Sequence, residues 1–531
     1  MKKLFTFSLL IVLGAVLFAN GFKISEVEYN ITGCGAKIFG ETQDYVLEKQ
    51  VPVDKKSVFP DRTTFEAYIN DYIVRLNNLR AFDSIDVQYE YIEDEPFLDE
   101  QGEYIYNTKL IVTVVDSFHL FAIPGPKYDS NTGLTLKLKI KDSNFLGSLN
   151  TLSSDIYFMF PTTESDASHS EFGFNANFDY PFKLGIFDAT WLNDFGISYT
   201  IGDSMPEWNI GTGLRFELPV SKHALIFEAN QKFNNNFAYK EFDDNLYFVN
   251  DFKISFPLKI AQLKYCGPVT YTPYFVTSVN WDFDGISTEN SSLSSPVITG
   301  GHKISFGRSD WIDNLRTGYS FYLDNYYTYN FQRQRFYPLI EMGSSAYKKI
   351  ELFGDTLFLR SMGLAADFHA FTFLFNPEND KYIDNDGKSI GSYLRGIRDN
   401  QIYDFEGMDR EVSALNPTNA IILNLDFPIH IFRTNFTKSF LKYCNFDLQL
   451  SPFIDMALCY NKITKTYLDP KDGFYASGVE VIVYPLKWSG ITIRGSIGID
   501  VGRRFLSNYI NTWWRENVSI KEFSLGFGLH Y

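Results

Sequence analysis

Three charged residues in the last third of the chain could form a guanidinium–carboxylate site. Arg395 lies in the polar segment "SIGSYLRGIRDNQ", and Asp426 and Asp455 lie in the two alternating segments that follow it. Alternation turns both carboxylates to one side of a sheet, where the planar fork of an arginine binds a carboxylate through two hydrogen bonds. Such a site would anchor a loop by electrostatics. The alternative is a solvated arginine, which is the usual state of an exposed loop arginine.

Other chemistry has little support in the sequence. The chain contains no G-x-S-x-G, no P-loop and no H-E-x-x-H, and its seven histidines are dispersed. Its four cysteines, Cys34, Cys266, Cys444 and Cys459, have neither zinc spacing nor the density of a disulfide scaffold. The net charge of −16 argues against a nucleic-acid partner, because phosphate binding needs a clustered basic surface. We therefore predict no enzyme, no cofactor and no metal site.

The elements that must position Arg395 are strands. After Asp116 the sequence is a succession of alternating segments about ten residues long, which is typical of a transmembrane barrel. "YPFK", "FPLK", "FPIH" and "YPLK" repeat an aromatic–proline pattern that is expected at one rim. We count eighteen candidate segments. The chain ends on a strand with alternating large apolar residues: Phe523, Leu525, Phe527, Leu529 and Tyr531.

Alternation also predicts what the two faces of these strands meet. In "NFDLQLSPFIDMALCY", one face is apolar, and the other carries Asp447, Gln449, Ser451 and Asp455. A half-buried sheet of a soluble sandwich is the alternative, but no region is left to cover the apolar faces. We therefore expect lipid outside and a polar lumen inside.

The N-terminal part has a different pattern. Residues 1–21 have two lysines followed by an apolar run and small residues, which predicts a secretory signal peptide; an uncleaved anchor helix is the alternative. Residues 22–116 predict a β-α-α-β-β domain. Its clearest helix places Phe65, Ile69, Tyr72, Ile73, Leu76 and Leu79 on one stripe, with Thr63 and Glu66 spaced as a capping box.

Four motifs in order resemble the BamA/TamA superfamily of outer-membrane assembly and secretion barrels, also called the bacterial surface antigen family. "KDSNFLGSL" is similar to an early-strand motif, and Leu394-Arg395-Gly396-Ile397 to the V-R-G-F/Y motif of the sixth external loop. Asn424, Asp426, Phe427 and Pro428 resemble N-x-E-x-x-F-P, and Phe453, Asp455 and Ala457 resemble F-x-D-x-G. The chain departs from the family at Ile397, Asp426 and Ala457, so a contact that needs an aromatic ring at position 397 is in doubt.

The resemblance implies a complete layout. Residues 22–116 would be a single polypeptide-transport-associated (POTRA) domain in the periplasm, and residues 117–531 a barrel of about sixteen strands in the outer membrane of a diderm bacterium. A loop around residues 376–417 would plug the lumen, with Arg395, Gly396, Asp426, Phe453 and Asp455 as its site residues. Glu480 and Arg494 could extend this network, although each could instead be a water-facing residue of the lumen.

The resemblance also implies a function. The POTRA domain would receive unfolded outer-membrane or secreted polypeptides and pass them to the seam between the first and last strands, with accessory lipoproteins or chaperones as possible partners and no cofactor. A passive outer-membrane porin and a secretion transporter are the alternatives. A phospholipase of a membrane barrel, which can lack the motifs sought above, is the enzymatic alternative.

Overall fold

The computed structural model describes most of the chain after the first twenty residues, and its residues fall into two compact units. The described residues are 21–33, 40–93, 96–98, 104–129, 133–160, 170–263, 266–353, 357–374, 387–397, 402–403, 412–413, 415–461, 464–487, 492–512 and 521–527. The first unit contains the described residues up to Phe118 together with Asn144–Leu149, and the second contains His119–Ser143 and the chain from Asn150 onward. The predicted signal peptide lies outside the described residues, apart from Gly21.

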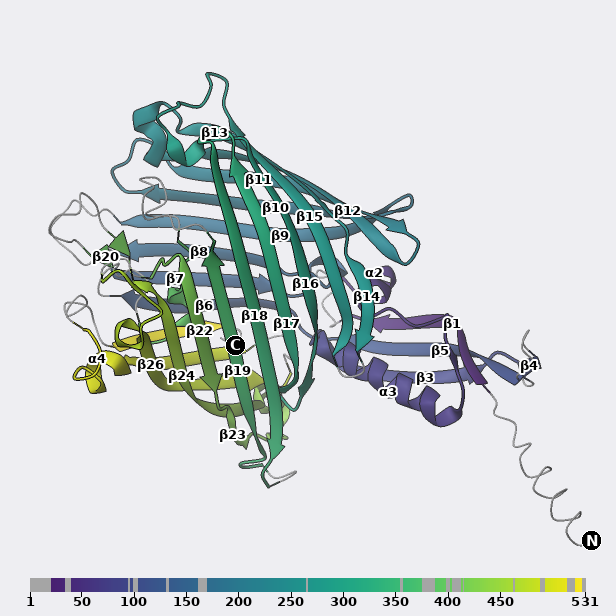
Figure 1. Cartoon of the computed structure of the whole chain (residues 1–531). Coiled ribbons are helices and arrows are strands. Elements are labelled where there is room, and N and C mark those ends of the chain that lie inside the picture. The colour runs from purple at the N-terminus through teal and green to yellow at the C-terminus, as the bar shows by residue number, and fades with distance from the viewer. Residues whose placement is uncertain are drawn as a thin grey trace, which may run out of the picture. The chain divides into compact units, whose positions relative to one another are not determined.

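The N-terminal unit is a small α+β domain, drawn in purple and dark blue in Figure 1. Its sheet has the order β2-β1-β5-β3, with β4 beside β5, and only the β1–β5 pair is parallel. The elements are β1 (Gly21–Thr32), α2 (Asp44–Gln50), β2 (Val58–Phe59), α3 (Arg62–Asn78), β3 (Phe82–Tyr91), β4 (Phe97–Leu98) and β5 (Tyr104–Asp116). The predicted β-α-α-β-β order is thus present, with two short added strands.

Helix α3 covers the sheet with the stripe expected from its period. Phe65, Ile69, Tyr72 and Leu76 are buried, and they pack against Leu110, Val112 and Val114 of β5 and other core residues. The predicted capping box is wrong. Asp61 is the N-cap and accepts a hydrogen bond from the Thr64 backbone N–H at 2.7 Å, while Glu66 pairs with Arg62. The helix begins two residues earlier than a cap at Thr63 would require.

Asn144–Leu149, from the early-strand motif, packs with the N-terminal unit. The Asn144 amide donates to Thr42 Oγ1 at 2.8 Å, and Thr42 donates through both its backbone N–H and its hydroxyl to the buried Asp116. Gly147 has a φ of +72°, and a Cβ there would collide with the Glu41 backbone. This unit therefore contains a segment that boundaries at 22 and 116 leave out.

The second unit is a closed antiparallel barrel (Figure 1). Its segments are β6 (Leu120–Asp129), β7 (Gly133–Asp142), β8 (Leu152–Phe160), β9 (Glu171–Leu184), β10 (Phe187–Thr200), β11 (Glu207–Val220), β12 (His223–Asn235), β13 (Leu246–Ser255), β14 (Leu258–Leu263), β15 (Gly267–Trp281), β16 (Val297–Ile312), β17 (Leu315–Asn330), β18 (Arg335–Glu351), β19 (Ser361–Phe373), β22 (Asn419–Asp426), β23 (Ile429–Arg433), β24 (Phe446–Asn461), β25 (Thr466–Tyr467), β26 (Phe474–Pro485), β27 (Ile493–Asp500) and β28 (Lys521–Phe527). The order β27-β28-β6-β7 closes the sheet.

Among the described residues, these segments form eighteen strand paths. Segment β14 continues β13 after Pro257, β23 continues β22 after Pro428, and β25 is a two-residue extension beside β24. A proline cannot donate to a ladder, so the two interruptions are expected at these positions. The barrel therefore has two more strand paths than the sixteen that the resemblance implies. Strands β15 to β19 are 13 to 17 residues long, and each pairs with both neighbours.

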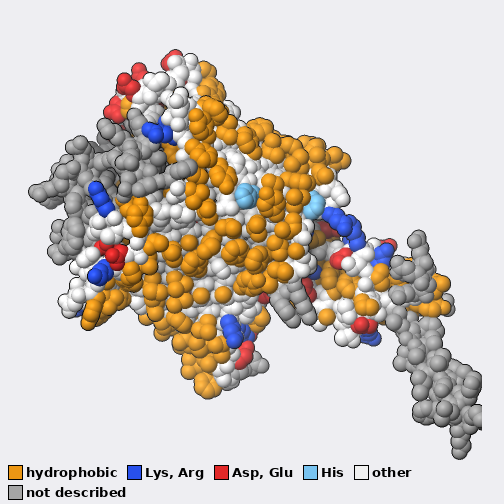
Figure 2. Space-filling model, in the orientation of Figure 1, with side chains coloured by type: hydrophobic (Ala, Val, Ile, Leu, Met, Phe, Trp, Pro, Cys, Tyr) orange, Lys and Arg blue, Asp and Glu red, His pale blue; other side chains and the backbone are white. Residues whose placement is uncertain are grey.

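On β24 the outward face is apolar and exposed, and the inward face is polar and covered. On β24, Leu450 and Ile454 are 36% and 40% exposed, whereas Asp447, Gln449, Ser451 and Asp455 are fully buried. Figure 2 shows hydrophobic side chains spread over the barrel strands on the visible face. Exposed apolar surface on this scale does not suit water. The fold is therefore a transmembrane antiparallel β-barrel, as predicted.

Two further points concern membrane segments and the C-terminus. No helix in the described part of the chain is long and apolar enough to cross a membrane. At the C-terminus, β28 holds Phe523, Leu525 and Phe527, and the Phe523 side chain is exposed. Leu529 and Tyr531 lie outside the described residues.

A short α-helix and a small two-stranded sheet also belong to the described part of the barrel unit. Helix α4 (Val501–Phe505) follows β27, and its N-cap Asp500 accepts a hydrogen bond from the Arg503 backbone N–H at 2.9 Å. Segments β20 (Ile402–Tyr403) and β21 (Val412–Ser413) pair with each other in the long connection between β19 and β22. This connection contains the predicted plug.

Candidate functional site

The connection between β19 and β22 enters the barrel and packs there through apolar side chains. Ile390, Leu394, Ile397 and Leu415 are fully or almost fully buried. They form one cluster with inward-facing residues of five strands: Leu339, Phe371, Ala420, Ile422, Ala457, Cys459, Phe474 and Ala476. Ile397, which stands where the family has an aromatic residue, fills a place in this cluster. The lumen beside β18 to β26 is therefore partly an apolar core, and not the wholly polar lumen that alternation suggested.

Arg395 makes the polar attachment of this plug. Its Nε and Nη2 donate to the two carboxylate oxygens of Asp455 at 2.9 and 2.8 Å, and its Nη1 and Nη2 donate to those of Asp426 at 2.7 and 3.0 Å. Its backbone N–H also donates to Asp455, at 2.9 Å. The Arg395 side chain is 6% exposed, and both carboxylates are less exposed still. One guanidinium thus bridges two strands, β22 and β24, inside the barrel.

The neighbours of Arg395 fix its direction. Its Cζ lies 3.7 Å from the centre of the Phe453 ring, so the guanidinium stacks on an aromatic face. Glu480 is fully buried, 3.8 Å from Arg395 Nη1 and 3.1 Å from Arg494 Nη1. Alternation left two possibilities for Glu480: an extension of this network, or a water-facing residue of the lumen. Because Glu480 is buried beside two arginines, it extends the network.

Gly396 allows the loop backbone to touch the wall. Its φ is +94°, and a Cβ at this position would lie 2.6 Å from the backbone nitrogen of Ile499 on β27. Gly498 is constrained in turn, since its own Cβ would lie 2.5 Å from the Gly396 Cα. The Gly396 N–H donates to Glu522 Oε2 at 2.7 Å. The plug therefore contacts β27 and, through Glu522, the last strand β28.

Two contacts of the plug, those with Asn424 and Glu522, could not be predicted from the sequence. Asn424 donates to Asp455 Oδ1 at 2.8 Å and to the Tyr393 carbonyl at 2.5 Å, which joins the wall to the turn before Arg395. In the sequence, Asn424 stands out only as the first residue of a motif. Glu522 lies on the last strand, and no spacing in the sequence links it to Gly396.

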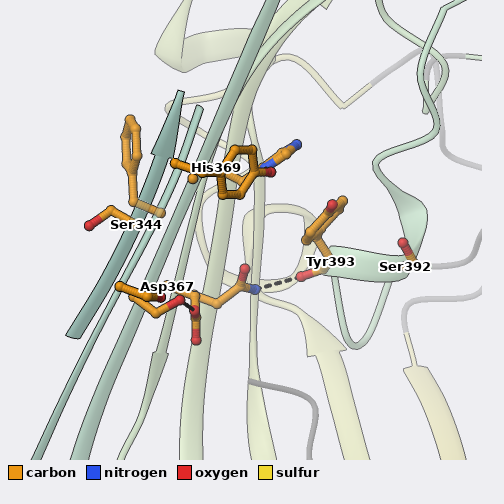
Figure 3. A pocket seen from close by; sticks show the side chains of 11 residues that line it. Ser344, Asp367, His369, Ser392 and Tyr393 are labelled. Atoms are coloured by element: carbon orange, nitrogen blue, oxygen red, sulfur yellow. Dashed lines mark hydrogen bonds between the residues drawn. The ribbon is translucent and has the colours of Figure 1, made fainter. Parts of the chain in front are cut away.

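A second attachment of the plug lies on β17, β18 and β19. Lys388 of the plug pairs with Glu341 of β18, and Tyr322 of β17 donates to Glu341 at 3.2 Å. The His369 ring stacks on Tyr393 of the plug with centroids 4.9 Å apart. Figure 3 shows His369 and Tyr393 beside a cavity of about 420 Å³ that is lined also by serines and Asp367. The plug is thus held from two sides.

A separate buried carboxylate holds the far end of β24. Asp447 is fully buried and accepts hydrogen bonds from Arg433 Nε and Nη2, each at 2.5 Å. His430 Nε2 lies 3.3 Å from Asp447 Oδ1. Asn314, in the turn between β16 and β17, also donates to Asp447, at 2.6 Å. In the sheet, β18, β19 and the β22–β23 path separate β17 from β24. The hydrogen bond from this turn to Asp447 is therefore made inside the barrel. We name Asp447, Arg433, His430 and Asn314 the Asp447 cluster.

Within the described ranges, no group of three or more histidine, cysteine, aspartate or glutamate side chains is arranged to hold a metal ion. The fold and the site together define the class: a plugged transmembrane β-barrel that also carries a small N-terminal α+β domain.

Comparison with known proteins gives similar structures and no sequence relatives. No protein-family model matches the chain, and no curated protein matches it. CdiB from Acinetobacter baumannii is similar at 12% identity and a TM-score of 0.46, over 95% of this chain and 73% of that one. BamA from Haemophilus ducreyi lacking POTRA domains 1–3 is similar at 11% identity and a TM-score of 0.36, over 95% and 84%. CdiB from Escherichia coli is similar at 8% identity and a TM-score of 0.38, over 97% and 91%.

At these identities and TM-scores the likeness does not distinguish one function from another. The function must come from the plug and the strands around it.

Proposed function

We propose that this protein is an outer-membrane factor that inserts or translocates polypeptides. In this proposal residues 22–116 are a POTRA-like domain in the periplasm, which receives unfolded outer-membrane or secreted polypeptides. The barrel, residues 117–531, passes them to the seam where β28 and β6 meet, while residues 376–417 plug the lumen. The partners in this proposal are membrane lipid and these clients, with accessory lipoproteins or chaperones as further candidates. The work needs no nucleotide, because strand pairing and burial in lipid supply the driving force.

The observation that carries the proposal is the connection between the plug and the seam strands. Gly396 touches β27 and donates to Glu522 of β28, so a movement of the plug changes contacts of the strand that closes the barrel. In the sheet order β27-β28-β6-β7 the first and last strands of the barrel meet, so in this proposal the seam between β28 and β6 is where a client strand enters.

The N-terminal unit offers a place to receive an extended client. Within the described part of that unit, β3 pairs with β5 alone, so no strand covers its other edge. An extended polypeptide can add to such an edge as a further strand. This supports a receiving role for the domain.

A passive porin is the alternative function, and the apolar cluster argues against it. A porin needs a continuous hydrated passage, whereas the plug packs Ile390, Leu394, Ile397 and Leu415 into the interior of the barrel. Conditional depletion of the protein tests the choice. We expect other outer-membrane barrels or secreted proteins to disappear from the cell envelope, with small-solute uptake unchanged. Loss of solute uptake with an unchanged protein profile would favour the porin.

A further inference from the structure

An apolar groove lies on the outer wall of the barrel, where β18, β19, β22 and β25 meet. Its volume is about 510 Å³, and Ile340, Met342, Ala370, Ile421, Tyr467 and Leu468 are among the residues that line it. Ala420 and Ile422 belong to the interior cluster, so Ile421 between them faces outward. Ala370 is the ladder partner of Ile421, and Met342 that of Ala370, so both share this outer side.

The groove exists because a small residue lies between larger ones and a short segment overhangs it. Ala370 lies between Met342 and Ile421 along the ladder. Above this row, β25 pairs with the end of β24, and the ring of Tyr467 packs on Tyr460 with centroids 4.4 Å apart. Tyr467 is 54% exposed, so it forms an overhanging wall that still faces outward.

The lining of the groove is uncharged and mostly apolar. None of the lining side chains is charged, and the side chains of Thr372 and Asn419 are hydrogen-bonded to each other. The hydroxyl of Tyr467 is the other polar group among the lining side chains. An empty apolar space forfeits dispersion contacts along its walls. The groove therefore suits a flexible hydrocarbon.

We propose that this groove holds one acyl chain of a bilayer lipid. The groove is continuous with the apolar outer face that makes the fold a transmembrane barrel, so hydrocarbon surrounds it. Tyr467 and Leu468 cover the chain from one side, which slows its exchange relative to lipids on the open wall. Because no charged side chain lines the site, the chain is bound and the headgroup is not recognised. The inference rests on the barrel fold and goes beyond the role in polypeptide insertion.

Native mass spectrometry of the full-length protein tests this site. The protein is released from nanodiscs of phosphatidylethanolamine or of phosphatidylglycerol with identical chains, into detergent that strips loosely held lipid. We expect one retained lipid in both cases. Ala370→Leu fills the groove and should lower this occupancy at least tenfold. The matched control is Ala366→Leu, which enlarges another outward alanine of β19 outside the groove and should retain the lipid.

Several results would overturn the inference. These are equal occupancy in the wild type and in Ala370→Leu, no retained lipid in the wild type, or retention of one headgroup only. Tyr467→Ala provides a second variant that leaves the strand intact; it should speed lipid exchange without loss of the folded barrel on semi-native gels. Unchanged exchange in Tyr467→Ala would also contradict the site. Client assembly is measured in parallel, so a failure of the lipid site remains separate from a failure of the proposed function.

Discussion

Arg395→Ala should release the plug while leaving the barrel folded. The change deletes four side-chain hydrogen bonds to Asp426 and Asp455 and leaves two buried carboxylates without their cation. Breaking a buried pair in this way costs about 3–5 kcal/mol, and less where water enters. If this energy is lost from the closed state of the plug, then the open fraction rises between about a hundredfold and a few thousandfold, at 1.4 kcal/mol per factor of ten.

Cys459 is a natural reporter of this opening. It is 3% exposed and lies in the same apolar cluster as Leu394 and Ile397, so a polar maleimide reaches it only when the plug moves away. In a chain whose other three cysteines are serine, the labelling rate follows the open fraction when opening is fast. We expect labelling to accelerate by the factor above, with noisier conductance in planar bilayers and weaker assembly of client proteins.

A control separates release of the plug from general loosening. Arg433→Ala removes another arginine that pairs with a buried carboxylate, Asp447, without touching the plug. Cys459 should therefore label at the wild-type rate in this variant. If Arg395→Ala labels within about twofold of the wild type, then the ion pairs do not hold the plug. If both variants accelerate equally, then the effect is general and the argument fails.

Three further outcomes are expected. Gly396→Ala should loosen the plug as Arg395→Ala does, because φ is +94° and Ile499 N lies 2.6 Å from the new Cβ; Gly125→Ala, with no atom within 4 Å, is its control in the Cys459 assay. Asp447→Asn should raise hydrogen–deuterium exchange in the β16–β17 turn and not in the plug, and equal exchange would contradict a structural role of the Asp447 cluster. Residues 22–116 should fold as a soluble, cooperatively melting domain, less stable than in the full chain because the fragment lacks the Asn144–Thr42 hydrogen bond. Burial raises the pKa of Tyr29 in the folded domain to about 12. As pH rises, Tyr29 therefore ionises first in the unfolded chain, which favours unfolding. The stability of the domain should be full below about pH 10 and fall towards pH 12. Tyr29→Phe should reduce that decline, and Tyr72, whose pKa burial also raises, should retain part of it. An insoluble fragment would contradict an independent domain.

The two faces of the barrel strands could be predicted from sequence because a strand has a period of two. On β24, every residue assigned to the polar side between Asp447 and Asp455 is buried, and the apolar residues between them are more exposed. Alternation says nothing about what covers the inner face. Alternation suggested a polar lumen. In the structure, the plug forms an apolar core with Ala457 and Cys459 near the end of β24, and the β16–β17 turn covers its beginning at Asp447.

Contacts between distant segments were the part that the sequence could not supply. Asn314 and Asp447 are 133 residues apart, and Gly396 and Glu522 are 126 apart. Neither pair has a spacing or a motif that joins it, because the closure of the barrel decides which turns and strands meet. The local error at the start of α3 has another cause. Asp61 and Thr63 both suit an N-cap, and the structure uses the earlier one.

The composition of the buried network indicates what it does. Arg395 and Arg494 face three carboxylates, of Asp426, Asp455 and Glu480, and all three carboxylates are almost fully buried. Buried ion pairs add little net stability compared with apolar residues of the same volume, since desolvation offsets most of the attraction. They do discriminate sharply between one geometry and every other. The apolar cluster would stabilise the plug in many positions, whereas the arginine fork accepts one, and that position presses Gly396 against β27 and brings it to Glu522 of the closing strand.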